Sequence, residues 1–285
     1  MIVSVRDLRF RYPKSTGDVL RGLDFDIAQG EIFGFLGPNG SGKSTTQKVL
    51  TKILPRYHGK VQVFGDDLAR VRTDYYNRIG VSFEFPNLHE KLTAEENLEF
   101  YRRFFDVPTE DPAALLRSLD LPVGDRRRAA AFSKGMKMRL VLARSLINRP
   151  KLWFLDEPTT GQDPEHAVKI RELIRAQAQA GVTVFLTTHD MTVADKLCDR
   201  IALIHEGTIV VNDTPRNLKL RYNERVVRME YRTGDGLRHE DFRLDDDTSK
   251  AAFVHAVQAK HVETIHTLEP SLEDVFLRLA GRGLM

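Results

Sequence analysis

The sequence predicts an α/β fold built on a mixed β-sheet, with a helical subdomain inserted in it and a small accessory unit in the C-terminal part. Three observations support this prediction. A glycine-rich loop lies between the apolar run 32–36 and a helical pattern, which is the strand-loop-helix order of an α/β core. Helical periodicity over about 88–149 separates this segment from the later apolar runs 152–155 and 182–188. Past Pro215 the apolar runs become short, and Arg, Asp and Gly become frequent.

The elements follow in order along the chain. We expect strands over residues 2–12, 23–27, 32–36, 60–64, 79–83, 152–155 and 182–188, and a closing core segment around 201–211. A helix follows the glycine-rich loop and is stopped by Pro55, and another spans about 165–180. A capped helix begins at Ser271, with Gly281 just past its end. The domains are therefore expected at 1–214, with the helical subdomain inset at about 88–149, and at 215–285.

Composition indicates an ordinary globular chain. Of its 285 residues, 41% are hydrophobic and 29% are charged, and 43 basic against 40 acidic residues leave a net charge of +3. Bulk electrostatics therefore gives no reason to expect a nucleic-acid partner. The single cysteine, Cys198, is expected to be a buried thiol in a reducing compartment. No apolar run approaches the roughly 18 residues that span a bilayer, and the N-terminal residues lack a signal-peptide layout. A membrane role would need another chain to cross the bilayer.

The glycine-rich loop fits the pattern G-x-x-x-x-G-K-[ST], a phosphate loop. Its glycines let backbone N–H groups approach the phosphates at a helix N-terminus. Lys43 is expected to reach the β- and γ-phosphates, and Ser44 to ligate Mg²⁺. The candidate phosphate-binding residues are Gly37, Pro38, Asn39, Gly40, Ser41, Gly42, Lys43, Ser44 and Thr45.

Two adjacent carboxylates, Asp156 and Glu157, directly follow the apolar run 152–155. At the end of a buried strand, the first can hold Mg²⁺ and the second can activate a water. Together with the phosphate loop, this pair predicts nucleoside-triphosphate hydrolysis.

The segment 132–139, Phe-Ser-Lys-Gly-Met-Lys-Met-Arg, resembles the L-S-G-G-Q signature of ATP-binding cassette (ABC) ATPases, and it precedes the carboxylate pair as it does in that family. The resemblance covers nearly the whole chain. It implies that Ser133, Lys134 and Gly135 bind the γ-phosphate of ATP held by an opposite subunit. Ser133 is a good N-cap, and a helix dipole favours an anion. The alternative is an ordinary capped helix.

Three further residues match family positions. His189, after the strand 182–188, matches the switch histidine that contacts the γ-phosphate and orients water; a surface or core histidine is the alternative. Asp163 matches the aspartate that joins the two subunits' sites, although Asp-Pro is also a common turn. Tyr12 resembles the aromatic that stacks on adenine, although aromatics are common in strands.

The chain also departs from the family pattern. Glu84 stands where the family usually has a glutamine, and we expect it to ligate the metal at some cost in nucleotide affinity. Lys134 replaces one of the two signature glycines and Met136 the glutamine, a variant that resembles the drug and lipid exporter branch. Lys134 either offsets part of the added charge of Glu84 or is simply a solvated side chain. Residues 83–88 also resemble those of a fluoroquinolone-type exporter.

The resemblance implies an ATPase subunit, using ATP and Mg²⁺, of a membrane exporter of drugs or other amphipathic compounds. Its partners would be a separate membrane-spanning permease and a second nucleotide-binding domain, in a homodimer or a homologous heterodimer. It would lie at the cytoplasmic face of a bacterial or archaeal membrane. An alternative is a soluble ABC ATPase acting on ribosomes or DNA, but such relatives typically carry two cassettes or a long coiled-coil insertion. A non-hydrolysing structural role is weakened by the presence of both Lys43 and Glu157.

Overall fold

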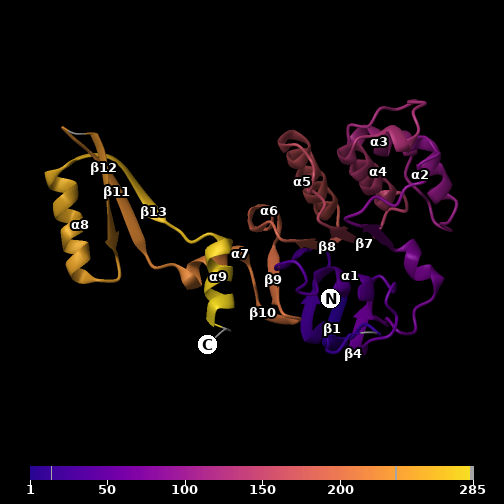
Figure 1. Cartoon of the computed structure of the whole chain (residues 1–285), viewed down its shortest axis with the longest axis horizontal. Helices are drawn as coiled ribbons and strands as arrows, with labels where there is room; N and C mark the ends of the chain where they lie inside the picture. The colour runs from indigo at the N-terminus through magenta and orange to yellow at the C-terminus, as the bar shows by residue number, and fades with distance from the viewer. Residues whose placement is uncertain (14, 235, 283–285) are drawn as a thin grey trace. The chain divides into compact units, whose positions relative to one another are not determined.

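The structure, a computed structural model, describes residues 1–13, 15–234 and 236–282. The chain divides into two compact units, Met1–Asp213 and Thr214–Met285, whose elements are labelled in Figure 1. The α/β fold expected from the sequence is confirmed, and each unit is described by itself.

A four-stranded sheet forms the N-terminal part of the first unit, in the order β2-β1-β4-β5. Its strands are β1 (Val3–Phe10), β2 (Leu20–Ile27), β4 (His58–Val63) and the short β5 (Asp66–Asp67). All of its pairings are antiparallel. In β1, Val3, Val5 and Leu8 are buried while Arg6 and Arg9 are exposed, so one face packs inward and the other meets solvent.

A six-stranded sheet, in the order β10-β9-β3-β8-β7-β6, carries the centre of the first unit. Its strands are β3 (Ile32–Leu36), β6 (Ile79–Ser82), β7 (Leu152–Asp156), β8 (Thr183–Thr188), β9 (Arg200–His205) and β10 (Thr208–Asp213). Only the β9–β10 pairing is antiparallel, so the sheet is mixed. Every residue of β3, β7 and β8 is buried, as expected for central parallel strands.

A cluster of aromatic rings fills the core between the sheets. Phe25 of β2 stacks on Phe33 of β3 with ring centroids 5.6 Å apart, and Phe185 of β8 lies 5.5 Å from Phe35 and 5.7 Å from Phe154. These rings are almost fully buried. Such packing fixes the ends of β3, β7 and β8, the strands that present the candidate site residues.

The helices of the first unit are α1 (Lys43–Leu50), α2 (Ala94–Arg102), α3 (Pro112–Ser118), α4 (Lys134–Leu146), α5 (Pro164–Gln179) and α6 (Met191–Leu197), with two 3₁₀ turns, η1 (Thr73–Asn77) and η2 (Ala129–Ala131). The helices α2, α3 and α4 pack on one another within the expected helical segment (Figure 1). A capping box formed by Thr93 and Glu96 starts α2, and Asp111 followed by Pro112 starts α3.

The second unit contains a three-stranded antiparallel sheet in the order β12-β11-β13. Its elements are α7 (Pro215–Tyr222), β11 (Val226–Thr233), β12 (Gly236–Arg243), α8 (Asp247–Ala259), β13 (His261–Leu268) and α9 (Leu272–Arg282). A small core of Met229, Tyr231, Phe242 and Ala256 joins the sheet to α8.

The ends of two expected helices were wrong, and the closing core segment proved to contain a turn. Helix α1 ends at Leu50 instead of continuing to Pro55, and Ile53 is consequently 52% exposed. The closing segment 201–211 is two strands, because Glu206 and Gly207 take positive φ and turn the chain between β9 and β10. Helix α9 continues through Gly281 to Arg282.

Candidate active site

The phosphate loop joins the buried strand β3 to α1. Its glycines are needed for two reasons, a lack of space for a side chain and a positive φ. A Cβ added at Gly37 would lie 2.2 Å from the carbonyl oxygen of Ile204, so only glycine fits against β9. Gly40 and Gly42 have φ values of +82° and +115°, a region that side chains rarely adopt. The loop therefore curls tightly, with its backbone accessible to an anion.

Lys43, at the start of α1, turns back into this loop. Its ammonium donates to the carbonyl oxygens of Gly37 at 2.8 Å and Pro38 at 3.1 Å, and only 6% of the residue is exposed. Burial lowers the pKa of the Lys43 ammonium, while the charges of Glu157, Asp156 and Glu84 act in the opposite direction. The lysine thus lies in a field of three carboxylates.

Asp156 ends β7 and lies beside the start of α1. Its Oδ1 accepts hydrogen bonds from the hydroxyls of Thr187 and of Ser44, the latter at 3.3 Å. Burial raises the pKa of the Asp156 carboxyl, and these two hydrogen bonds partly oppose the shift. A serine hydroxyl and a carboxylate side by side form an oxygen-only donor set, which is the chemistry that Mg²⁺ prefers.

Glu157 occupies the first residue after β7 with φ +50°, which is uncommon for a residue with a side chain. Its Oε1 accepts from the backbone N–H of His189 at 2.9 Å and lies 2.6 Å from the ring Nδ1 of the same residue. Its Oε2 accepts from Thr188 at 3.0 Å and Thr160 at 3.3 Å. Four hydrogen bonds therefore hold this carboxylate at the carboxyl ends of β7 and β8.

Glu84 follows β6 in the loop after Ser82, and its side chain is exposed. Its negative charge is one of the influences that oppose the lowering of the Lys43 pKa by burial. Among the described residues, no group of three or more His, Cys, Asp and Glu side chains is arranged to hold a metal ion.

Tyr12, two residues beyond β1, lies beside the start of α1. Its hydroxyl is 3.2 Å from that of Thr45, and its ring meets Phe10 edge-on at 4.9 Å. The structure thus gathers Tyr12, Lys43, Asp156, Glu157 and His189 around one loop.

The signature residues lie elsewhere in the first unit. Ser133 caps α4, where its Oγ accepts from the backbone of Met136 at 3.2 Å, and Lys134 is exposed. Asp163 caps α5 by accepting from the backbone of His166 at 3.0 Å. Ser133 and Asp163 are both exposed, and these capping hydrogen bonds lie within the first turns of their own helices.

Sequence reasoning missed the hydroxyl groups that hold the carboxylates and the amide of Gln162. Thr187, Thr188 and Thr160 bond Asp156 or Glu157, and Gln162 donates to the carbonyl oxygen of Gly135 at 3.2 Å. The threonines are sequence neighbours of His189 and Glu157, and that adjacency could have suggested their role.

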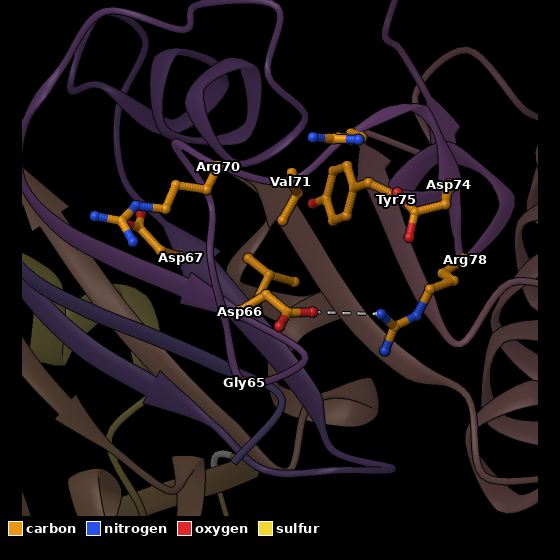
Figure 2. A pocket seen from close by; sticks show the side chains of 10 residues that line it. Gly65, Asp66, Asp67, Arg70, Val71, Asp74, Tyr75 and Arg78 are labelled. Carbon is orange, nitrogen blue, oxygen red and sulfur yellow. Dashed lines mark ion pairs between the residues drawn. The ribbon is translucent and has the colours of Figure 1, made fainter.

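Several pockets lie outside this site, and two of them have mixed or apolar linings of interest. One of about 460 Å³ lies between β4, η1 and the loop between them, and Figure 2 shows its charged side chains. There Asp66 pairs with Arg78 at 3.8 Å and Asp67 with Arg70 at 3.6 Å, so its charges are largely balanced. The other, of about 270 Å³, lies between the segment after α1, β6 and the helical segment; its lining includes Ile53, Tyr76, Phe83, Asn87, Tyr101, Phe105 and Arg144.

None of the helices in the described part of the chain has the length and hydropathy that a membrane crossing needs.

Known proteins resemble this chain over its whole length. Residues 20–160 match the family model for ABC transporters, and residues 225–269 match that for the fluoroquinolone efflux ABC transporter C-terminal domain. The fluoroquinolones export ATP-binding protein of Mycobacterium tuberculosis is 48% identical, over 99% of this chain and 94% of that protein. The daunorubicin resistance ATP-binding protein of Streptomyces coeruleorubidus is 35% identical, over 92% of this chain and 90% of that protein.

A solved structure described as the ATP-binding subunit of an ABC transporter is 28% identical, with a TM-score of 0.71, covering 78% of this chain and 93% of that chain. The family resemblance drawn from residues 132–139 is therefore confirmed by relatives that match from end to end. This chain belongs to the family of ABC transporter ATP-binding proteins, which bind and hydrolyse ATP.

Proposed function

We propose that this chain is the ATP-hydrolysing subunit of a membrane exporter of drugs or other amphipathic compounds. The observation that carries the hydrolytic part is the gathering of Lys43, Asp156, Glu157 and His189 at the ends of three neighbouring strands. The direction of transport is supported by its relatives, which are described as a fluoroquinolones export protein and a daunorubicin resistance protein.

In this proposal the loop Gly37–Thr45 holds the triphosphate, Tyr12 stacks on the adenine, and Lys43 leaves its carbonyl partners for the β- and γ-phosphates. Mg²⁺ would be held by Ser44, Asp156 and Glu84; their oxygen donors and the 3.3 Å contact between the first two support that set. When bound, the ion would neutralise charge on the phosphate oxygens.

Glu157 is the proposed base. Its Oε1 accepts a proton from the attacking water, while His189 stays within hydrogen-bond reach of that oxygen and orients the water. Lys43 and His189 then stabilise the negative charge on the transferred phosphoryl group. The hydrogen bonds from Thr188 and Thr160 to Oε2 fix the carboxylate, so little reorganisation is needed at the moment of reaction.

A complete site would need two nucleotide-binding domains, either two copies of this chain or this chain and a homologue. The exposure of Ser133, Lys134 and Asp163 at two helix N-termini supports this arrangement, since these groups are accessible to a second subunit. Because the closed pair binds ATP better than ADP, hydrolysis would open it.

A separate membrane-spanning permease is the proposed partner at the cytoplasmic face of a bacterial or archaeal membrane. The cavity of about 270 Å³ beside Phe83 and Tyr101 supports a docking groove for a helix of that permease. Phe85, two residues beyond Phe83, is 73% exposed, as is typical of an aromatic that awaits a partner. We further propose that residues 1–214 act as the nucleotide-binding domain, with the inset 88–149, and that 215–285 have an accessory or regulatory role.

The deciding experiment purifies the chain with its membrane-spanning partner in vesicles and measures ATP turnover and transport of a fluoroquinolone. Export that requires ATP and is absent in Glu157→Gln supports the proposal. A soluble role would instead give hydrolysis stimulated by ribosomes or DNA and indifferent to the permease.

A further inference from the structure

Gln162 connects the loop after the catalytic carboxylate to the signature turn of the same chain. Its amide Nε2 donates to the carbonyl oxygen of Gly135 at 3.2 Å, across 27 positions of sequence. The two residues are also in close packing, because a Cβ added at Gly135 would lie 3.4 Å from the Gln162 Oε1. One side chain thus both packs against and bonds the first turn of α4.

Lys134 adds a second contact between the same two segments. Gly161 has φ +75°, and a Cβ at this position would lie 3.5 Å from Cε of Lys134. The aliphatic part of this lysine therefore covers the loop at Gly161, while its ammonium remains at the surface.

The other end of this loop holds Glu157. Thr160 donates its backbone N–H to the Glu157 carbonyl at 3.1 Å and its hydroxyl to the Glu157 carboxylate at 3.3 Å. Glu157, which carries the carboxylate, and Gln162, which contacts Gly135, are therefore only five positions apart in the sequence. The position of the signature turn and the position of Glu157 are set by one short, hydrogen-bonded segment.

We propose that Gln162 is a positioning residue that holds the signature turn where it can receive the γ-phosphate of the opposite subunit's ATP. The inference rests on the proposed two-subunit site. An apolar side chain of the same length would fill the space but leave the Gly135 oxygen without this donor. The turn would then sample other positions, and the two subunits would pair less tightly although neither loses a contact to its own nucleotide.

The test uses the full chain in a Glu157→Gln background, in which bound ATP persists. Gln162→Met removes the donor at nearly constant length, and Gln179→Met, at the exposed end of α5, is the matched control. Sedimentation at saturating Mg-ATP gives the dimer dissociation constant, and fluorescence of an ATP analogue at low protein concentration gives the nucleotide affinity of the monomer.

We expect Gln162→Met to raise the dimer dissociation constant about tenfold, because each of the two loosened signature turns must be ordered on association, at a cost of about threefold for each turn. The monomer's nucleotide affinity and its melting temperature should match those of Gln179→Met. Equal dimer dissociation constants for the two variants would overturn the inference, and so would a parallel loss of monomer nucleotide affinity, which would indicate general disruption. A Glu157→Gln parent that stays monomeric in ATP would overturn the two-subunit proposal together with this one.

Discussion

The Oε1 of Glu157 lies 2.6 Å from the Nδ1 of His189, and the same oxygen accepts the backbone N–H of that histidine. The two residues come from the ends of the neighbouring strands β7 and β8, whose register pairs Asp156 with Thr187. Sheet geometry therefore places a carboxylate and an imidazole together at the edge where ligands bind in open α/β sheets.

Glu157→Gln should lower ATP turnover about a hundredfold or more, since the amide cannot accept the proton of the attacking water. The amide oxygen can still accept from Thr188, and so the fold should be unchanged. Phosphate release and nucleotide affinity are the measurements. Turnover at the wild-type rate with ATP bound would show that another group is the base.

Asp156→Asn should stabilise the nucleotide-free protein at pH 7 while it weakens Mg-dependent ATP binding. Burial raises the folded-state pKa of this carboxyl above the unfolded value of about 3.9. The resulting stabilisation is present below the unfolded pKa and is lost as pH rises through the folded pKa, so at pH 7 the buried charge costs stability.

Thermal unfolding without nucleotide checks this prediction. A gain of about 1 kcal/mol would raise the melting temperature by about 2–4 °C at pH 7, and the gain should shrink towards pH 4.5. Asp74→Asn, at an exposed position in η1, is the control and should change nothing. A lower melting temperature for Asp156→Asn at pH 7 would show that the hydrogen bonds from Thr187 and Ser44 outweigh burial.

Glu84→Gln should tighten ATP binding severalfold, because it removes one of three negative charges that act on Lys43. ATP titrations with and without Mg²⁺ separate the effect of the Glu84 charge on ATP from its effect as a ligand of the ion. A tightening confined to Mg-free conditions would indicate that the carboxylate ligates the ion. If neither titration nor turnover changes, Glu84 lies outside the nucleotide site.

Gly80→Ala should destabilise the first unit by about 1–3 kcal/mol. A Cβ at this residue of β6 would lie 2.0 Å from the carbonyl oxygen of Ser145 in α4, so strand and helix would have to separate. Gly17→Ala, where no atom lies within 4 Å of the added carbon, is the matched control. Denaturant unfolding gives the free energy of unfolding of both variants. Equal values for Gly80→Ala and Gly17→Ala would mean that β6 and α4 can move apart without cost.

The sequence predicted the hydrolytic half of the fold well for a physical reason. Strands β3 and β7 are buried on both faces, so their sequences are continuous apolar runs, and each is followed at once by candidate site residues. The second unit offered no such pattern. Only one residue of β12 is buried and none of β13, so neither strand alternates clearly.

Long-range contacts were also beyond sequence reasoning. The bond from Gln162 to Gly135 depends on how α4 packs beside the loop after β7. Helix α1 ends at Leu50, and Lys52 takes a φ of +59°, a left-handed conformation that the apolar pattern continuing to Leu54 does not reveal. The residue types in the sequence therefore predicted the candidate site residues, whereas contacts between distant segments, such as that of Gln162 with Gly135, depend on tertiary packing.

In the proposed dimer, Lys43 of one subunit and the Ser133-led helix end of the other bind the same γ-phosphate. Ser133→Arg in the Glu157→Gln background tests this shared contact, because the added side chain blocks the helix end and leaves the phosphate loop of its own chain unchanged. We expect this variant to bind one ATP per chain and to stay a monomer in sedimentation, where Glu157→Gln alone gives an ATP-dependent dimer. A Ser133→Arg protein that forms this dimer with unchanged affinity would show that the helix end does not bind the γ-phosphate.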